Sequence, residues 1–284
     1  MTQLNETEIK EVVKERYGNL AREASAEEAT SCCDDGCCGA EAELDVIMPL
    51  YTGTDTEGLP IEAIAASAGC GNPTALASLS PGETVVDFGS GGGIDCFLAA
   101  REVGESGRVI GIDMTQDMVN LANSNARKLG LSNAEFRLAE IDNTTLDNDT
   151  ADIIISNCVI NLAPDKDSVF QEAFRILKPG GRMMISDMVL VDDIPNEEAE
   201  DTANWVACLA GAEMKDVYLG RMETAGFVDV QVASETALDS NEGWRAPVRS
   251  MNIQASKPKI APPFLYRAVQ ETGIWISGDD VFSG

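Results

Sequence analysis

The residues with the clearest chemical potential are the glycines between positions 89 and 93. They follow a short expected strand, Val85–Phe88, and precede a helical pattern that begins at Ile94, which predicts a strand, a glycine loop and a helix. Glycine lets the backbone approach a ligand closely, and the first turn of a helix offers unpaired N–H groups to an anion. Asp113 ends the next apolar run, 20 residues after Gly93, where a nucleotide-binding fold places a carboxylate against ribose hydroxyls. The stretch therefore predicts a site for a nucleotide-like cofactor.

The spacing of these glycines discriminates between cofactors. A dinucleotide fingerprint, G-x-G-x-x-G, would need its third glycine at position 94, which is Ile94. The pattern present is D-x-G-x-G-x-G, from Asp87 through Gly89, Gly91 and Gly93. It resembles motif I of the S-adenosylmethionine-dependent methyltransferases with a Rossmann-like fold, and this resemblance implies S-adenosylmethionine as the cofactor. A glycine turn in an ordinary βαβ unit and an NAD site are the alternatives.

Cysteines are the second group with chemical potential: the chain has eight, and it has no histidine. The commonest general base is therefore missing, and any mechanism must work without it. Cys70 lies between glycines just before an expected helix start at Asn72, where the helix dipole favours a thiolate. Cys158 follows the fourth expected strand, near the end of the sheet where open α/β folds bind ligands. Cys208 lies in an inserted segment, and core packing is the alternative for Cys158 and Cys208.

The other cysteines differ in their surroundings. Four of them lie in the acidic stretch SCCDDGCCG: Cys32, Cys33, Cys37 and Cys38. Small and acidic neighbours predict an exposed loop, whose thiols could be catalytic or redox-active, bind zinc, or bind metal adventitiously and oxidise locally. Adjacent pairs fit the C-x-x-C spacing of zinc sites poorly. Cys96 lies within the helix after the glycine loop, beside Phe97, and is expected to be a buried small hydrophobe.

The elements that must position these residues alternate along the chain. Helices are expected at 7–24, 94–103, 116–129, 167–177 and 213–225, and strands at 85–88, 108–112, 134–138, 152–156, 182–189, 228–232 and 251–255. Residues 191–212 form an insertion, acidic and then helical. The order predicts an α/β fold with a seven-stranded, mostly parallel sheet and helices on both faces. We divide it into an N-terminal helix and cysteine-rich loop (1–43), a cofactor domain (44–190), and a segment (191–284) with the insertion, the last strands and a tail.

Composition limits the possible partners and compartments. Acidic residues number 48 and basic residues 20, for a formal charge of −28. Nucleic acid is not an expected partner, because its binding depends on neutralising phosphates with Lys and Arg, and an anionic membrane surface is disfavoured for the same reason. No apolar run reaches the ~18 residues of a membrane span, and the N-terminus has no signal-peptide pattern. We therefore expect a cytoplasmic protein, whose cysteines do thiol or metal chemistry more than they build disulfides.

The contexts of three cysteines narrow the methyltransferase class. CGNPTALASL at Cys70, ISNCVINLAPDK at Cys158 and CLAGA at Cys208 resemble the arsenite methyltransferases. The resemblance runs from about Tyr17 to about Val232 and includes DFGSGGGIDCFLAA and VIGIDMT. It implies a class I methyltransferase fold whose last strand is antiparallel, and an insertion that binds the metalloid. It also implies that these three cysteines bind trivalent arsenic, whose lone pair attacks the sulfonium methyl.

The resemblance further implies how the enzyme is reset. Methyl transfer leaves arsenic pentavalent, and thiols must reduce it by forming a disulfide. That disulfide joins Cys70 to Cys32, Cys33, Cys37 or Cys38; the family has a single cysteine there, so the doubled pairs leave the choice open. Thioredoxin or glutathione then acts as reductant, and arsenite or methylarsenite arrives as a thiol conjugate. Two other functions remain open: a class I C-methyltransferase of a quinone or sterol, and a non-catalytic metalloid-binding protein.

The predicted cofactor ligands lie at the carboxyl ends of the first four strands. Glu140 and Ile141 follow the third strand, where this fold lays its adenine ring, although an ordinary polar turn is the alternative there. The full set is Asp87, Gly89, Ser90, Gly91, Gly93, Asp113, Met114, Glu140, Ile141 and Asn157.

Overall fold

The computed structural model describes residues 5–26, 57–67, 69, 71–199, 204–205, 208–238 and 243–259. Helices in these residues are α1 (Glu6–Ala26), α2 (Ile61–Ala65), α3 (Pro73–Leu76), α4 (Ile94–Val103), α5 (Gln116–Leu129), α6 (Lys166–Ile176), α7 (Asn196–Ala199) and α9 (Lys215–Thr224), with 3-10 turns η2 (Ile160–Leu162) and η3 (Gly243–Arg245). Strands are β1 (Thr84–Phe88), β2 (Arg108–Asp113), β3 (Ala134–Leu138), β4 (Ala151–Asn157), β5 (Leu177–Leu190), β6 (Val228–Ala237) and β7 (Val248–Ser256). The predicted alternation is confirmed.

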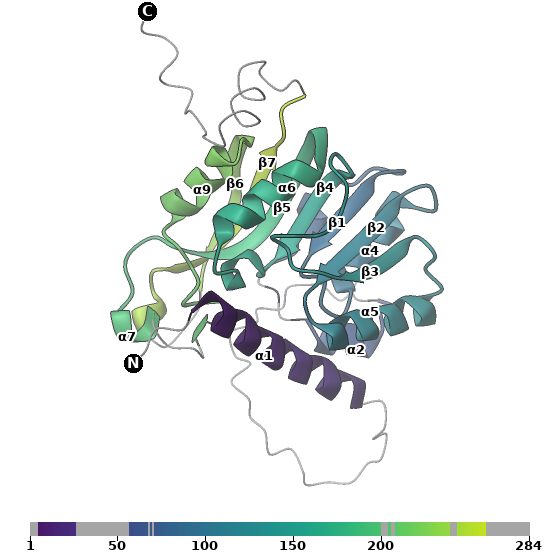
Figure 1. The fold of residues 1–284 in the computed structure, drawn as a ribbon, viewed down its shortest axis with the longest axis horizontal. Coiled ribbons are helices and arrows are strands. Elements are labelled where there is room, and N and C mark those ends of the chain that lie inside the picture. Colours follow the sequence, from purple (N-terminus) through teal and green to yellow (C-terminus); the bar gives the residue numbers. More distant parts are fainter. Residues whose placement is uncertain are drawn as a thin grey trace, which may run out of the picture.

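The strands form one seven-stranded sheet in the order β3-β2-β1-β4-β5-β7-β6 (Figure 1). The first five pair in parallel, and the last strand, β7, is antiparallel, as predicted. It lies between β5 and β6. From β1 the chain proceeds outward to β2 and β3, and then returns to place β4 on the other side of β1. Ligands of open α/β sheets bind at this kind of switch point. The topology therefore directs attention to the carboxyl ends of β1 and β4.

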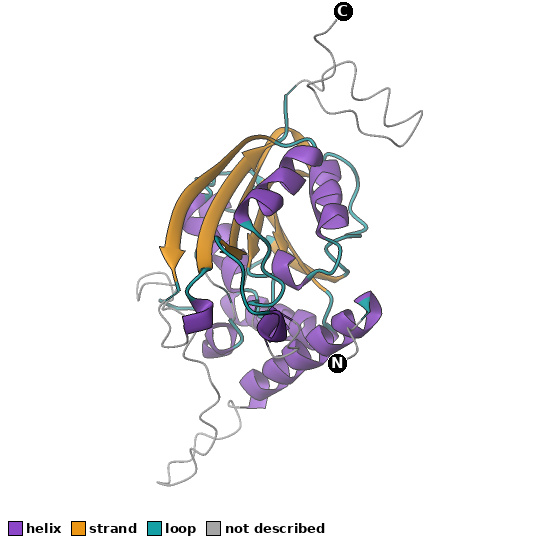
Figure 2. Ribbon diagram, turned by 90° about the vertical axis from the view of Figure 1, so that its left-hand side faces the viewer, coloured by secondary structure: helices purple, strands orange, loops and turns teal. Residues whose placement is uncertain are grey.

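Helices cover both faces of the sheet (Figure 2). Side chains of α4 and α5, such as Phe97 and Ala122, pack on one face with Val85 and Ile153. Side chains of α6 and α9 pack on the other face with the alternate strand positions, among them Val86. Because both faces are buried, the central strands are apolar on both sides, which explains why they read as continuous hydrophobic runs.

Helix α1 lies beside α5, across the end of the sheet (Figure 1). Val13 and Tyr17 pack in an apolar cluster with Cys158 and Cys208, and Ala21 packs in another with α5. The amphipathic pattern of residues 7–24 thus buries its apolar face over the carboxyl ends of the strands. In the described part of the chain, no helix is long and apolar enough to cross a membrane.

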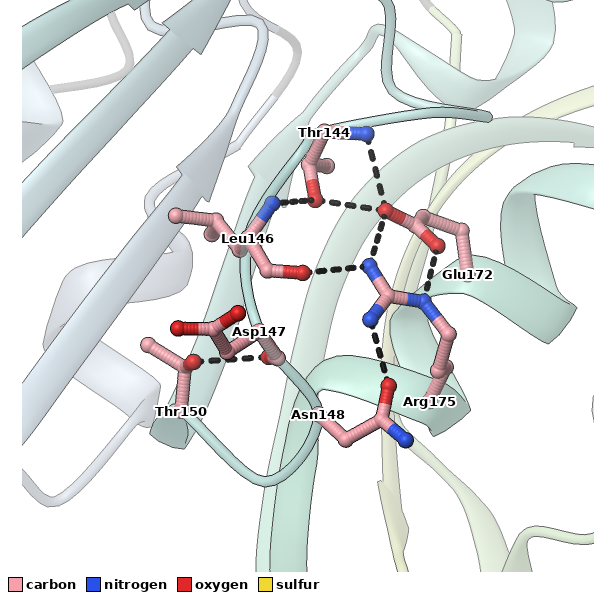
Figure 3. A network of polar contacts seen from close by, with 7 residues as sticks. All are labelled: Thr144, Leu146, Asp147, Asn148, Thr150, Glu172 and Arg175. Atoms are coloured by element: carbon pink, nitrogen blue, oxygen red, sulfur yellow. Dashed lines mark hydrogen bonds and ion pairs between the residues drawn. The ribbon is translucent and has the colours of Figure 1, made fainter.

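A polar network fixes the loop between β3 and β4 to α6 (Figure 3). The Glu172 carboxylate, whose side chain is 8% exposed, accepts hydrogen bonds from Thr144 N at 2.8 Å and Thr144 Oγ1 at 2.5 Å. Arg175 donates to the same carboxylate at 2.7 and 2.8 Å, and to the carbonyl oxygen of Leu146 at 2.7 Å. This loop begins with residues 140–142, so the network fixes the base of the segment predicted to meet the adenine ring.

Several segments differ in extent from the expected elements, among them β7, which begins at Val248. Strand β5 begins at Leu177 and so includes the KPGG sequence, and β6 continues to Ala237. Both extensions pair with neighbouring strands: Leu177 with Ala151 of β4, and residues 234–237 with β7. Such pairing is a tertiary effect that local pattern does not reveal. The described part of the insertion holds the single-turn α7 and a turn at Cys208, and residues 200–203, 206 and 207 lie outside the described ranges.

Candidate active site

A cleft opens at the carboxyl ends of β1, β2 and β4, with α1 along one side. The empty space within it, including the open mouth, is about 950 Å³. Eight of the predicted cofactor residues line it, together with the predicted arsenic ligand Cys158: Gly89, Ser90, Gly91, Asp113, Met114, Glu140, Ile141 and Asn157. The structure therefore brings most of the predicted site into one concavity.

The glycine loop is shaped by packing against neighbouring side chains. Gly89 has φ +75°, and a Cβ there would lie 2.5 Å from Cγ1 of Val159, the residue after Cys158. Gly93 has φ +97°, and its Cβ would lie 2.5 Å from the ring of Phe97. At Gly91 the nearest atom to a Cβ would be 3.9 Å away, so this position leaves open space. The outer glycines thus fix the loop, and the middle one leaves its backbone accessible from the cleft.

Asp113 and Ser90 supply the polar groups of this part of the cleft. The Asp113 carboxylate accepts from Thr115 N at 2.8 Å and from Gly91 N at 2.9 Å. Burial raises the pKa of Asp113, while these bonds oppose the shift. An ionised carboxylate has about four acceptor positions, so it can accept a further donor beside these. Ser90 Oγ is buried without a hydrogen-bond partner among the described residues. The chain's own groups therefore fit a ligand that presents hydroxyl groups, as a ribose does.

The rim after β3 is tied to α1 by ion pairs. Lys10 Nζ lies 2.5 Å from Glu140 Oε2 and 2.8 Å from Asp142 Oδ2, and Lys14 Nζ lies 3.3 Å from Glu140. Hydrogen bonds from Lys10 are the largest influence on Glu140 and lower its pKa. Glu140 lines the cleft as predicted, but its carboxylate also holds α1, a use that the sequence pattern did not reveal. Lys10 and Tyr17 line the cleft too, and the only sequence signal for them was the amphipathic helix itself.

Two predicted cofactor residues, Asp87 and Gly93, do not line the cleft in the described structure. Asp87 is 2% exposed and accepts a hydrogen bond from Cys96 Sγ at 3.2 Å. Burial, and then the charge of Asp95, raise the pKa of Asp87. Cys96 is fully buried, as predicted. Asp87 thus contacts α4 in the interior of the protein and not the cleft.

Asp95 is a cleft residue that the sequence analysis missed. It lies in the first turn of α4, is 5% exposed, and accepts from Thr74 Oγ1 at 3.1 Å and from Asn157 Nδ2 at 3.2 Å. A buried carboxylate in a cleft favours a cationic ligand group. An acidic residue two positions after the last loop glycine was the available signal.

Asn157 docks the segment around position 70 onto the sheet. Its side chain donates to Gly71 O at 2.7 Å and accepts from Gly71 N at 3.2 Å. A Cβ on Gly69 would meet the Asn157 side chain, and one on Gly71 would meet Ser186 at 2.5 Å. The glycines on either side of position 70 are therefore packed against the ends of β4 and β5. Cys70 itself, like Cys32, Cys33, Cys37 and Cys38, lies outside the described residues.

Cys158 and Cys208 are in contact although 50 residues separate them. Cys208 Sγ donates to the backbone oxygen of Cys158 at 3.1 Å, and each cysteine is 3% exposed. Cys158 takes part in a disulfide bond, whereas Cys208 and Cys96 are free thiols. Both site cysteines have positive φ, 56° at Cys158 and 61° at Cys208. Cys158 lines the cleft, whereas Cys208 packs against Cys158 and does not itself line the cleft in the described structure.

Buried charges surround the free thiol. Burial raises the pKa of Cys208, Asp187 adds to the shift, and Tyr17 and Lys166 oppose it. Burial likewise raises the pKa of Asp187 to about 7, although hydrogen bonds from Tyr218 at 3.0 Å and from Met188 N act to lower this pKa. Lys166 is 4% exposed, and burial lowers its pKa. A thiol in this setting is protonated at neutral pH, so a soft ligand must displace its proton to bind.

Comparison with known proteins agrees with this geometry. A family model described as a methyltransferase domain matches residues 79–226. The chain is 38% identical over 267 residues to an arsenite methyltransferase of Halobacterium salinarum, covering 88% of this chain and 67% of that protein. It is 33% identical over 232 residues to an arsenite methyltransferase of Aquipseudomonas alcaligenes, covering 79% of this chain and 64% of that one. The chain thus spans about two thirds of the length of these two relatives.

Solved structures of methyltransferases also resemble this chain. An arsenic(III) S-adenosylmethionine methyltransferase from Chlamydomonas reinhardtii superposes with a TM-score of 0.65 at 32% identity, over 74% of this chain and 73% of that one. A Haemonchus contortus phosphoethanolamine N-methyltransferase, solved with S-adenosylhomocysteine, superposes with a TM-score of 0.57 at 17% identity, over 67% of this chain and 53% of that one. The second likeness concerns the fold alone.

Proposed function

Because the chain belongs to the arsenite methyltransferase family, we propose that it methylates trivalent arsenic held by cysteine thiolates, with S-adenosylmethionine as methyl donor. One observation carries the proposal: Cys208 Sγ lies 3.1 Å from the backbone oxygen of Cys158, which lines the same cleft as the glycine loop and Asp113. Two cysteines from distant parts of the chain thereby lie together, one lining the nucleotide-type site and the other buried against it.

The donor is held by the residues around the glycine loop. Asp113 accepts the ribose hydroxyls through its free lone pairs, Ser90 Oγ supplies a further polar contact, and Ile141 and Met114 supply apolar surface for the adenine. The buried carboxylate of Asp95 complements a positive charge. S-adenosylmethionine supplies an electrophilic methyl group, which becomes bonded to arsenic as its bond to the sulfonium sulfur breaks.

The cysteines bind arsenic and then reduce it. Each thiol that binds arsenic displaces one ligand and releases its proton. Cys158 and Cys208 form the minimum site, and Cys70 adds a third sulfur. Arsenic is an electron-pair donor in the transfer, so no proton is removed from the nucleophile and no histidine is required. Because Cys158 is in a disulfide in this structure, that bond must be reduced before arsenic can bind.

Transfer leaves a pentavalent, positively charged methylarsenic centre bonded to three thiolates. A fourth thiolate restores trivalent methylarsenic bonded to two thiolates, and two sulfurs leave as a disulfide. We propose that Cys70 and one of Cys32, Cys33, Cys37 and Cys38 form it, and that thioredoxin or glutathione reduces it. Arsenite or methylarsenite enters as a thiol conjugate, which exchanges its thiols for those of the protein.

The test is a turnover assay with labelled donor, a thiol and either arsenite or a quinone precursor, with the arsenic products speciated. We expect label in arsenic species only, and loss of that label in Cys158→Ser and in Cys208→Ser. The control is Cys96→Ser, because the Cys96 thiol is buried against Asp87 and away from the cleft. Label in the quinone would favour the C-methyltransferase, and arsenic binding without donor consumption would favour a binding protein. Full activity in Cys158→Ser would refute the thiolate site.

The reset is tested separately by changing Cys32, Cys33, Cys37 and Cys38 to serine together. We expect methylation of inorganic arsenite to stop, because the pentavalent arsenic formed by methyl transfer can no longer be reduced. The affinity for the methyl donor should be retained. A full rate from inorganic arsenite would exclude these residues as redox partners.

A further inference from the structure

The two site cysteines share a backbone conformation that requires external support. Cys158 and Cys208 have φ of 56° and 61°, in the left-handed region that residues other than glycine, asparagine and aspartate rarely adopt. Such a conformation persists only where the surrounding structure imposes it, and it is concentrated at functional sites. The supporting contacts for Cys208 are of particular interest, because it lies in a turn rather than at the end of a strand.

Asn161 makes these contacts. It lies in η2, three residues after Cys158, and is fully buried. Its side-chain Nδ2 donates to Met188 O at 2.6 Å and to Cys208 O at 3.4 Å. Its backbone N donates to Asp187 Oδ2 at 3.1 Å. One residue therefore joins the segment of Cys158, the end of β5 and the turn of Cys208.

The Cys208 turn meets Asn161 at a second point. A Cβ on Gly211 would lie well inside 3.0 Å of the Asn161 backbone oxygen, so the turn passes directly over it. The orientation of the amide follows from its partners, because the opposite orientation would point Oδ1 at two carbonyl oxygens. The contact thus has a defined direction, with the amide nitrogen as donor to the turn.

We propose that Asn161 is a positioning residue for arsenic: its amide fixes the turn of Cys208 relative to Cys158 and so sets the separation of the two thiols. This inference rests on the proposed function, in which both thiols bind one arsenic atom. A dithiol site depends steeply on this separation, since a displacement of ~1 Å can cost about 100-fold in a site that requires defined geometry.

The experiment measures affinity for phenylarsine oxide, which binds two thiols and releases one water. It uses the reduced full-length chain with Cys32, Cys33, Cys37, Cys38 and Cys70 changed to serine. Among the cysteines that remain, Cys96 is buried against Asp87, so Cys158 and Cys208 form the available dithiol. If this background does not bind phenylarsine oxide, the proposed function fails, and the inference fails with it.

Three variants are compared in this background. Asn161→Ala removes the amide, Asn161→Asp keeps its shape but turns an oxygen toward the two carbonyls, and Gly211→Ala pushes the turn away from Asn161. We expect each to weaken phenylarsine oxide binding about 10- to 100-fold. Donor affinity, measured by calorimetry, should stay within about twofold, as for independent sites. Gly211→Ala keeps the inference testable should the Asn161 variants fail to fold.

Two matched controls separate positioning from general damage. Asn125 is also a fully buried asparagine, and its Nδ2 donates to Gly92 O at 3.1 Å, beneath the donor loop. Asn125→Ala should weaken donor binding and leave phenylarsine oxide binding unchanged. Gly220→Ala, on α9 with open space around its Cβ, should change neither. Equal phenylarsine oxide affinity in the background and in the folded Asn161 and Gly211 variants would overturn the inference.

Discussion

Replacement of Gly89 by alanine tests whether the glycine loop and the cysteine segment are packed as one unit. Gly89 follows β1, whereas Val159 follows Cys158, and a Cβ on Gly89 would approach three side-chain atoms of Val159 within 3.0 Å. The loop that faces the donor thus lies directly against the residue next to a proposed arsenic ligand. A side chain at Gly89 must therefore displace one of the two segments.

The expected loss of unfolding free energy in Gly89→Ala has two parts. Placing alanine at φ +75° costs roughly 1–2 kcal/mol of backbone strain. Overpacking against Val159 adds about 1–3 kcal/mol. The control Gly130→Ala carries only the first cost, because Gly130 has φ +67° and nothing lies within 4 Å of its Cβ. We therefore expect Gly89→Ala to lower the free energy of unfolding by about 1–3 kcal/mol more than Gly130→Ala.

A double-mutant cycle with Val159→Ala isolates the packing part. Truncating Val159 removes the two methyl groups that a new Cβ would meet and leaves its own Cβ at 2.8 Å. We expect the double variant to recover about 1–2 kcal/mol relative to the sum of the single effects, as contacting residues do. Unfolding in urea gives the free energies, and calorimetry gives the donor affinity, which should fall in Gly89→Ala and recover in part. Equal costs for Gly89→Ala and Gly130→Ala, or additive effects in the cycle, would refute the packing argument.

Three further predictions concern the surroundings of the site. Hydrogen bonds to Glu172 from Arg175 and Thr144 outweigh burial and lower its pKa, so its contribution to stability is present above pH ~4.3 and is lost as pH falls through its folded pKa. Unfolding free energies should therefore show Glu172→Gln destabilised by about 1–3 kcal/mol at pH 7, with the gap closing in acid; a constant gap would contradict this. Lys10→Met should flatten the salt dependence of donor affinity, measured by calorimetry, because the pairs with Glu140 and Asp142 are half-exposed and screened; an unchanged slope would exclude that role. Cys96→Ser should cost about 1 kcal/mol in unfolding free energy, since its hydroxyl can still bond Asp87, while a loss of several kcal/mol would contradict it.

Much of the fold was predictable because its signals are local. The succession of an apolar run, a glycine loop and a helical pattern predicted the bounds of β1, α4 and β2 nearly to the residue. The reason is that buried parallel strands are apolar on both faces and glycine marks the turn. The N-terminal extension of β5 and the full length of β6 were not predictable, because they form by pairing with strands distant in sequence. That Asp95 lines the cleft while Asp87 is buried beneath it was not predictable, because a motif does not record which way a side chain points.

The sequence alone determined the methyltransferase motif, the absence of histidine and the presence of cysteines with arsenite-methyltransferase contexts, because these are properties of residue type and spacing. Only the tertiary structure decided that Cys208 reaches Cys158, that Asn161 joins their segments, and that Lys10 of α1 meets Glu140 across 130 residues. The physical reason is that each of these contacts depends on how a turn or helix docks onto the sheet. Docking is set by the combined packing of all the elements, and no short stretch of sequence specifies it.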